Sequence, residues 1–173
     1  MSGQPDRSVL ALQATSLGCL VQAARAYFDL PATVASHFNA AGFPDGWAPK
    51  GGFLGLYAGM VVLLWISLSG AVRSIQRAPN DRLNLPNKDY WLAPERRDKT
   101  LATVASYLRV FGAATNLLLM DVFAQALAVN LRHAARLGHP MISLTAYIAF
   151  TIVWIAALVR GFRSKPGQGS QNS

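Results

Sequence analysis

The stretch FLGLYAGMVVLLWISLSGAV (residues 53–72) decides the fold of this chain. Its only ionisable side chain is the phenol of Tyr57. An α-helix rises about 1.5 Å per residue, so about 20 residues cross a hydrocarbon core about 30 Å thick. A run of this length and composition therefore predicts a membrane-spanning helix.

The composition of the whole chain agrees with a membrane environment. Hydrophobic residues make up 52% of the 173 residues, charged residues make up 14%, and the mean hydropathy is +0.26. A soluble domain carries about 25% charged residues, so this chain has too few to coat a water-soluble globule. The net charge of +8 lies mainly between the apolar runs, which favours anionic lipid headgroups rather than nucleic acid as the partner of the cations.

Three further apolar runs predict membrane spans at residues 9–28, 108–131 and 141–159. Together the runs predict an all-α bundle of four transmembrane helices within residues 1–160, followed by a disordered basic tail at residues 161–173. The first run is the weakest, because it contains Gln13, Gln22 and Arg25. A signal peptide is the alternative there, since Ala24, Arg25 and Ala26 resemble a cleavage site.

The distribution of Lys and Arg predicts the orientation in the membrane. Eleven lie in the N-terminal segment, the connection at residues 73–107 and the tail, whereas four lie on the opposite side: Arg25 near the end of the first span, and Lys50, Arg132 and Arg136 in the other two connections. Cytoplasmic loops carry the excess of positive charge. We therefore expect both termini to lie in the cytoplasm and the loop at residues 30–52 to face outward.

The outward loop contains a polar and aromatic motif but many helix breakers. We expect one short helical turn at residues 33–39 and tight turns at residues 42–47. His37, Asn39 and Asp45 suggest a metal or peptide site, but their spacing matches no metal-ligand motif. The favoured alternative is structural, with His and Asn bonding the loop backbone while Phe38 and Trp47 plug the mouth of the bundle. The motif residues are His37, Phe38, Asn39, Gly42, Pro44, Asp45, Gly46, Trp47 and Lys50.

The second polar motif lies within NLPNKDYWLAPERRDKT (residues 84–100). Two adjacent arginines beside two aromatic residues suit a phosphate group or an acidic partner segment. Two alternatives stay open: a clamp with aromatics and arginines at the lipid headgroups, and an internal network of ion pairs. Pro94 and Glu95 predict the start of a helix. The motif residues are Pro86, Asn87, Lys88, Asp89, Tyr90, Trp91, Pro94, Glu95, Arg96 and Arg97.

The third predicted span carries Asn116, Asp121 and Gln125. Asp121 is expected near the midplane, facing the bundle interior, because a carboxylate facing lipid is costly. Gln125 lies one turn further on and is expected to hydrogen-bond to it. In the second span, small residues recur every four positions, which lets two helices approach closely. We expect this ridge to pack inside the bundle rather than against a second copy; its glycines are Gly51, Gly55 and Gly59.

Two blocks of the sequence resemble a known family. The first is LP at residues 30–31 with HFNAAGFPDGWAPK at residues 37–50, and the second is LPNKDYWLAPERR at residues 85–97. The first block is similar to the short domain of unknown function in SdpI-type integral membrane proteins, and the second to a block in bacterial members with that domain. The resemblance implies a bacterial multi-pass membrane protein, which we expect in the cytoplasmic (inner) membrane. It also implies immunity to a secreted peptide toxin or membrane sequestration of a repressor, roles of longer relatives with additional spans.

These features favour a protein that binds rather than catalyses. The sequence contains no Ser-His-Asp order, phosphate-binding loop or Cys/His cluster, so we expect no enzymatic activity, no cofactor and no metal. The predicted function is binding or regulation of a peptide or protein partner. One alternative is a small transporter that uses the polar face at Asn116, Asp121 and Gln125. Another is an accessory subunit, or a homo-oligomer, within a larger membrane complex.

Overall fold

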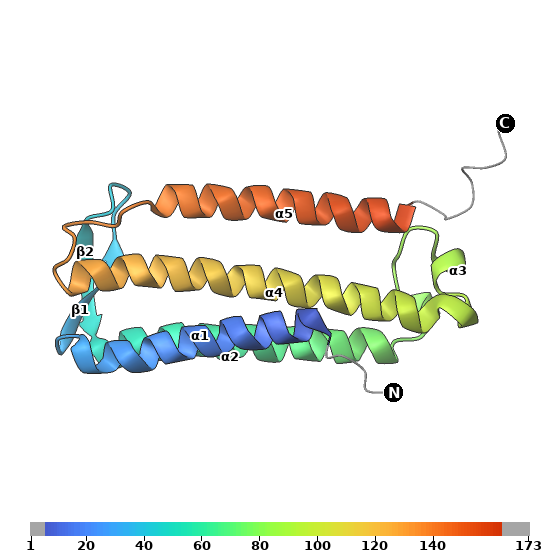
Figure 1. Ribbon diagram of the computed structural model, residues 1–173, viewed down its shortest axis with the longest axis horizontal. Helices are drawn as coiled ribbons and strands as arrows, with labels where there is room; N and C mark the ends of the chain where they lie inside the picture. Colours follow the sequence, from blue (N-terminus) through green and yellow to red (C-terminus); the bar gives the residue numbers. More distant parts are fainter. Residues whose placement is uncertain (1–5, 164–173) are drawn as a thin grey trace.

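Four long helices make up the bundle in the computed structural model, which describes residues 6–163 (Figure 1). All four are long and apolar enough to cross a membrane, which confirms the predicted all-α four-helix bundle. Consecutive long helices run in opposite directions, so Arg7 and Arg163 lie at the same end of the bundle. The helices are α1 (Arg7–Asp29), α2 (Lys50–Arg77), α4 (Pro94–Asn130) and α5 (Pro140–Arg163).

The two ends of the bundle differ in structure. The end with the strands β1 (Thr33–Phe38) and β2 (Pro44–Pro49) is called the hairpin end here. The opposite end, with Arg7 and Arg163, is called the termini end, and it carries the short helices η1 (Asn80–Arg82) and α3 (Lys88–Trp91). The helices also extend further than expected. The connection between α2 and α4 covers residues 78–93, whereas residues 73–107 were predicted. Residues 161–163 of the predicted tail belong to α5, and the rest of that tail lies outside the described residues.

The loop at residues 30–52 is a β-hairpin, so the predicted helical turn at residues 33–39 and the tight turns at residues 42–47 are wrong. β1 and β2 pair antiparallel, with Val34 opposite Ala48 and Phe38 opposite Pro44. The turn between the strands is held by the Asn39 side chain, whose Oδ1 accepts the N–H groups of Ala41 and Phe43. Asn bonding its own turn in this way favours a hairpin over a helix.

The core lies where α1, α2 and α4 pack together. The buried side chains come from all three helices and from β1, and include Cys19, Val34, Tyr57, Val61 and Phe123. By contrast, α5 packs on α4, away from α1 and α2 (Figure 1), and its most apolar segment has no buried residue. The molecule therefore consists of a tight three-helix unit with one peripheral helix.

The glycine ridge of α2 does not pack inside the bundle, contrary to expectation. A methyl group added at Gly51, Gly55 or Gly59 would meet no atom within 4 Å. The contacts of α2 with its neighbours are made instead by a stripe that includes the buried Leu54 and Tyr57. Both stripes have helical spacing, and the stripe with Leu54 and Tyr57 offers more atoms for van der Waals contact with the other helices than the glycines do.

Candidate functional site

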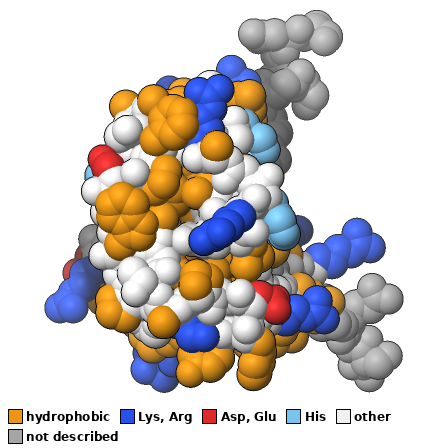
Figure 2. Space-filling view, turned by 90° about the vertical axis from the view of Figure 1, so that its left-hand side faces the viewer, with side chains coloured by type: hydrophobic (Ala, Val, Ile, Leu, Met, Phe, Trp, Pro, Cys, Tyr) orange, Lys and Arg blue, Asp and Glu red, His pale blue; other side chains and the backbone are white. Residues whose placement is uncertain are grey.

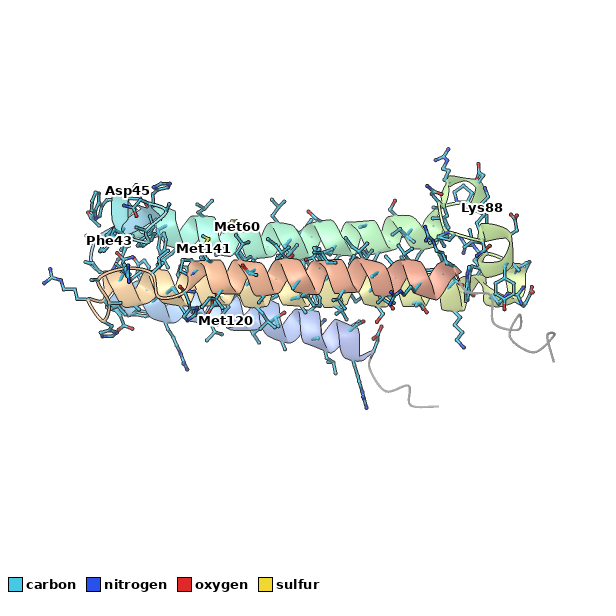
Figure 3. All side chains as sticks on the ribbon, turned by 90° about the horizontal axis from the view of Figure 1, so that it is seen from above. Phe43, Asp45, Met60, Lys88, Met120 and Met141 are labelled. Carbon is cyan, nitrogen blue, oxygen red and sulfur yellow. The ribbon has the colours of Figure 1, made fainter. Side chains whose placement is uncertain are left out.

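The hairpin end brings together only part of the proposed metal or peptide site. His37 Nδ1 lies 2.5 Å from Asp45 Oδ1, and both side chains are largely exposed. Asn39 does not join them, because its Oδ1 accepts two backbone N–H groups of the turn. Figure 3 shows Asp45 and Phe43 at this end and Lys88 at the opposite end. The structure thus supports the structural role of Asn39 and leaves an exposed His–Asp pair.

Three other motif residues fix how the hairpin sits on the helices. Gly42 has a φ of +83°, which only glycine adopts readily, and its carbonyl oxygen accepts the N–H of Leu137. A Cβ at Gly46 would lie 3.0 Å from the Cβ of His37, so the strands approach closely there. Lys50 Nζ lies 2.9 Å from the carbonyl oxygen of Tyr27, near the end of α1. These residues shape and anchor the hairpin.

The aromatic side chains of the hairpin face different surroundings. Phe38 lines a groove beneath the hairpin. Trp47 does not plug the bundle, because it is 63% exposed, and Phe43 is 45% exposed. Figure 2, which looks onto this end, shows apolar side chains on the surface interspersed with cationic ones. The hairpin end therefore presents exposed aromatic residues beside positive charge.

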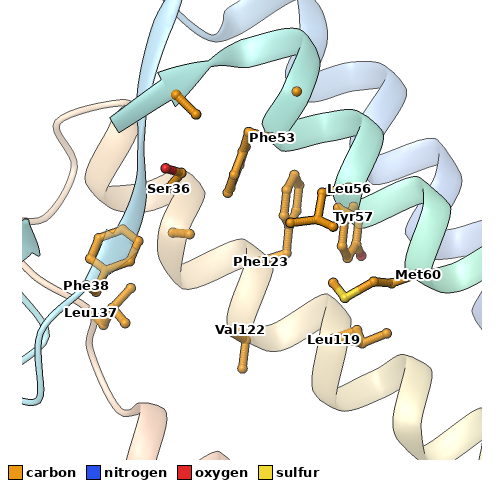
Figure 4. A pocket seen from close by; sticks show the side chains of 13 residues that line it. Ser36, Phe38, Phe53, Leu56, Tyr57, Met60, Leu119, Val122, Phe123 and Leu137 are labelled. Atoms are coloured by element: carbon orange, nitrogen blue, oxygen red, sulfur yellow. The ribbon is translucent and has the colours of Figure 1, made fainter. Parts of the chain in front are cut away.

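An apolar groove of about 380 Å³ lies between the hairpin, α2 and α4 (Figure 4). Tyr57 and Phe123 stack with ring centroids 3.8 Å apart, and Phe53 stacks on Phe123 at 5.2 Å. The Tyr57 hydroxyl donates to Gln22 Oε1 of α1, so its polar atom is engaged away from the groove. The other large apolar side chains that line the groove are Phe38, Leu56, Met60, Leu119, Val122 and Leu137.

Asn130, at the end of α4, holds the hairpin against the bundle, a role that the sequence did not predict. Its Oδ1 accepts the N–H of Ala35 at 2.6 Å, and its Nδ2 donates to the carbonyl oxygen of Ala35 at 3.0 Å. The amide therefore pairs with the free edge of β1 as a neighbouring strand would. No motif surrounds Asn130, and its partner lies 95 positions away, so sequence spacing could not reveal this role.

Replacing Asn130 by leucine should lower the free energy of unfolding by about 2 kcal/mol, because the buried N–H and C=O of Ala35 lose their partners. Thermal unfolding in detergent measures the loss, and hydrogen exchange at the Ala35 amide should speed up. The matched variant Asn130→Asp keeps the acceptor for Ala35 N–H but loses the donor to the carbonyl oxygens of Ala35 and Ala126, so it should also lower the free energy of unfolding, with slower exchange at the Ala35 amide than in Asn130→Leu. Unchanged exchange in Asn130→Leu would contradict this role.

At the termini end, the second motif attaches the end of α5 to the rest of the protein. Trp91 Nε1 donates to the carbonyl oxygen of Phe162 at 2.7 Å, and the two rings pack edge to face. Asn87, with a φ of 52°, donates from Nδ2 to the carbonyl oxygens of Phe162 and Arg163. The last carbonyls of α5 thus receive donors from this motif.

The arginines of the same motif bind within the chain rather than pointing to a partner. Arg97 donates to the carbonyl oxygen of Ala78, next to the end of α2, and to Asn80 Oδ1. Arg96 donates to the carbonyl oxygen of Tyr90 and lies over its ring at 4.2 Å, and it also pairs with Glu95. Of the predicted network of ion pairs, the salt bridges among residues 6–163 include only the contact between Arg96 and Glu95, and the two arginines bind backbone carbonyls instead.

Other residues of the motif remain at the surface or begin a helix. Lys88 and Asp89 line a shallow polar cavity together with Asn80 and Asp81. Pro86 is exposed just before this segment. Pro94 occupies the first turn of α4, as predicted, where a proline without an N–H fits a helix start.

The polar residues of α4 form two separate sites. Asn116 is fully buried and donates to Ser16 Oγ of α1 at 2.9 Å. Asp121 Oδ2 instead accepts from Gln125 Nε2 at 2.7 Å, which confirms that predicted pair, and from Ser143 Oγ of α5 at 2.6 Å. A helix turns about 100° per residue, so residues 116 and 121 point roughly 140° apart. The expected single polar face is therefore wrong.

Asp121 meets the start of the peripheral helix α5. Its partner Ser143 belongs to the first turn of α5, at the hairpin end. Gln125 Oε1 also accepts the N–H of His139, directly before that helix. The cluster of Asp121, Gln125, His139 and Ser143 thus attaches the start of α5 to α4, as Trp91 and Asn87 attach its end.

Comparison with known proteins adds one finding. Residues 14–61 match the model of a family described as a domain of unknown function (DUF1648). No curated protein and no solved structure matches the chain. The matched region contains the second half of α1, the whole hairpin and the first half of α2, and it leaves out the motif around Trp91. The chain is therefore a multi-pass membrane protein in which a helix–hairpin–helix unit is similar to a domain of unknown function.

Proposed function

We propose that this protein is a non-catalytic inner-membrane protein of the SdpI-like type that binds an apolar segment of a peptide or protein partner at its hairpin end. The observation that carries the proposal is the groove beneath the hairpin. Its volume of about 380 Å³ lies within the range of about 300–1,000 Å³ usual for ligand pockets.

The walls of the groove suit an extended apolar or helical segment. On α2, Phe53, Leu56 and Met60 follow one another at spacings of three and four residues and form one wall. Leu119 and Val122 of α4 belong to the opposite wall. Grooves of this kind bind a partner helix through apolar side chains at matching spacing. In the bilayer, such binding depends on close van der Waals packing.

The rim of the groove supplies residue types common in protein interfaces. Trp47 and Phe43 are exposed on the hairpin, and the Arg136 guanidinium lies 5.7 Å from the centre of the Phe43 ring. Aromatic residues and arginine are enriched where proteins contact one another. The His37–Asp45 pair adds polar groups to the same rim.

The proposed orientation places this rim outside the cell, since the excess of Lys and Arg lies at the termini end. A secreted peptide would then reach the groove without crossing the membrane. This is the arrangement that the proposed SdpI-like role in toxin immunity requires. The second motif contributes little to partner binding in this proposal, because its arginines and Trp91 bind the ends of helices.

Site-specific photocrosslinking in cells tests the proposal. A photoreactive amino acid at Met60, inside the groove, should give a peptide or protein adduct that mass spectrometry identifies. The same probe at Leu63, which is 64% exposed on α2 outside the groove, serves as the matched control and should give lipid adducts. Trp47→Ala should reduce the adduct at Met60. Lipid adducts alone at both positions would contradict the proposal.

A further inference from the structure

A second cleft, of about 280 Å³, lies at the termini end, lined by α1, α2 and Arg109 of α4. On α2 it is lined from Trp65 to Gln76, a length of about 16 Å along the helix. Along α2 the lining is apolar at Trp65 and Leu68, mixed at Ser69 and Val72, and polar or charged at Arg73 and Gln76. The cleft therefore has the polarity gradient of an amphiphile, apolar toward the bilayer centre and cationic toward the end of the bundle.

The apolar floor of the cleft exists because of a glycine beneath it. A Cβ at Gly112 of α4 would lie 2.2 Å from Leu68 Cδ1 and 3.0 Å from Leu12 Cδ1. Without that atom, both leucines sink against the α4 backbone between the helices. The space above them is thereby left open, and their methyl groups form a surface on which a hydrocarbon chain can pack.

Of the two arginines that line the rim of the cleft, Arg73 is the one available to a ligand. Arg109 is paired with Asp6, with Nη1 and Oδ2 2.9 Å apart. The hydroxyl and then the N–H of Ser8, helped by Arg109, hold the pKa of the Asp6 carboxyl below its usual range, so Asp6 stays ionised and neutralises Arg109. Among residues 6–163, the Arg73 guanidinium takes part in none of the salt bridges.

The depth of Arg73 matches that of lipid phosphates. The 28 residues of α2 extend about 42 Å, which exceeds a hydrocarbon core of about 30 Å. Arg73 directly follows the apolar run at residues 53–72, so its guanidinium lies at the edge of the core. Gln76, three residues beyond Arg73 on α2, lines the same rim and offers an amide donor to phosphate oxygens.

We propose that this cleft binds the phosphate group of an anionic phospholipid at Arg73, with an acyl chain along Leu68 and Trp65. The phosphate receives the charge-assisted bonds of the guanidinium. The apolar floor distinguishes a lipid from free phosphate, because only a lipid fills the deep part of the cleft. This site is separate from the groove at the hairpin end, and its occupancy does not depend on a protein partner.

Native mass spectrometry of the full-length protein, released from nanodiscs of phosphatidylcholine with phosphatidylglycerol, tests the proposal. Arg73→Ala should lower retention of phosphatidylglycerol about fivefold, the effect of removing one cation near the surface. Arg77→Ala, one turn further along α2 and outside the cleft, is the matched control and should change retention little. Equal losses in the two variants would overturn the proposal in favour of general attraction between the cations and the membrane.

Two further arms separate lipid from free phosphate. Ser69→Phe fills the cleft but keeps every charge, and it should lower retention as Arg73→Ala does; unchanged retention would overturn binding inside the cleft. Inorganic phosphate at millimolar concentration should not displace phosphatidylglycerol, whereas displacement would identify a phosphate site without lipid selectivity. Thermal unfolding of each variant in phosphatidylcholine alone checks that the fold is intact.

Discussion

Replacing Trp91 by alanine should release the end of α5 from the bundle and lower the free energy of unfolding by about 3 kcal/mol. The variant loses the hydrogen bond from the indole N–H to the carbonyl oxygen of Phe162 and the edge-to-face packing on the Phe162 ring. The consequence is large because Phe162 is the only buried residue of α5, and this helix packs mainly on α4.

Hydrogen exchange and thermal unfolding in detergent measure this effect. Exchange should increase in the last turn of α5 and stay near the original rate in the first turn, which Ser143 and His139 attach to α4. Trp91→Phe keeps the ring packing but removes the N–H donor, so its free energy of unfolding should fall by about 1 kcal/mol. Trp47→Ala removes an exposed indole and should change stability by less than about 0.5 kcal/mol. Unaltered exchange in Trp91→Ala would show that α5 is held elsewhere.

Replacing Phe123 by alanine should lower the free energy of unfolding by about 4 kcal/mol, the largest loss among the changes predicted here. Phe123 is 4% exposed and stacks on both Tyr57 and Phe53. Its removal leaves a void between α2 and α4 and takes away one wall of the groove. The variant should therefore unfold at lower temperature and also lose the crosslinked partner at Met60.

Val122→Ala is the matched control for Phe123. Val122 is the preceding residue of the same helix, lines the same groove and is 39% exposed, so its truncation should cost less than about 1 kcal/mol. Comparing the two variants separates loss of stability from loss of the groove surface. Equal thermal stability of the two variants would refute the assignment of Phe123 to the core.

The two polar motifs share a physical role, because both satisfy carbonyl groups at the ends of helices. Lys50 binds carbonyls at the end of α1, Arg97 binds Ala78 after α2, and Asn87 and Trp91 bind the last residues of α5. The last four carbonyls of a helix have no partner within the helix, and cations are favoured there by the helix dipole. Near a bilayer, where water is scarce, such donors become more valuable.

The remaining long helix, α4, ends without such a donor from either motif. Arg132, with a φ of 60°, follows α4, and the N–H groups of His133 and Ala134 both bind the carbonyl oxygen of Ala128. This turn satisfies the end of α4 with its own backbone, as left-handed helix endings commonly do.

The sequence by itself determined the four helices, the start of α4 at Pro94 and the Asp121–Gln125 pair. These are local properties, since a helix needs only an apolar run of sufficient length, and residues four apart always share a face. The same rule of about 100° per residue also separates Asn116 from Asp121, so that error was avoidable from the sequence.

Only the tertiary structure decided which partner each side chain meets. Whether Gly51, Gly55 and Gly59 face a helix or the outside depends on how α2 is rotated against α1 and α4. The pairing of Asn130 with Ala35 and of Trp91 with Phe162 joins residues 95 and 71 positions apart. Such contacts follow from the packing of whole helices, and short stretches of sequence do not encode that packing.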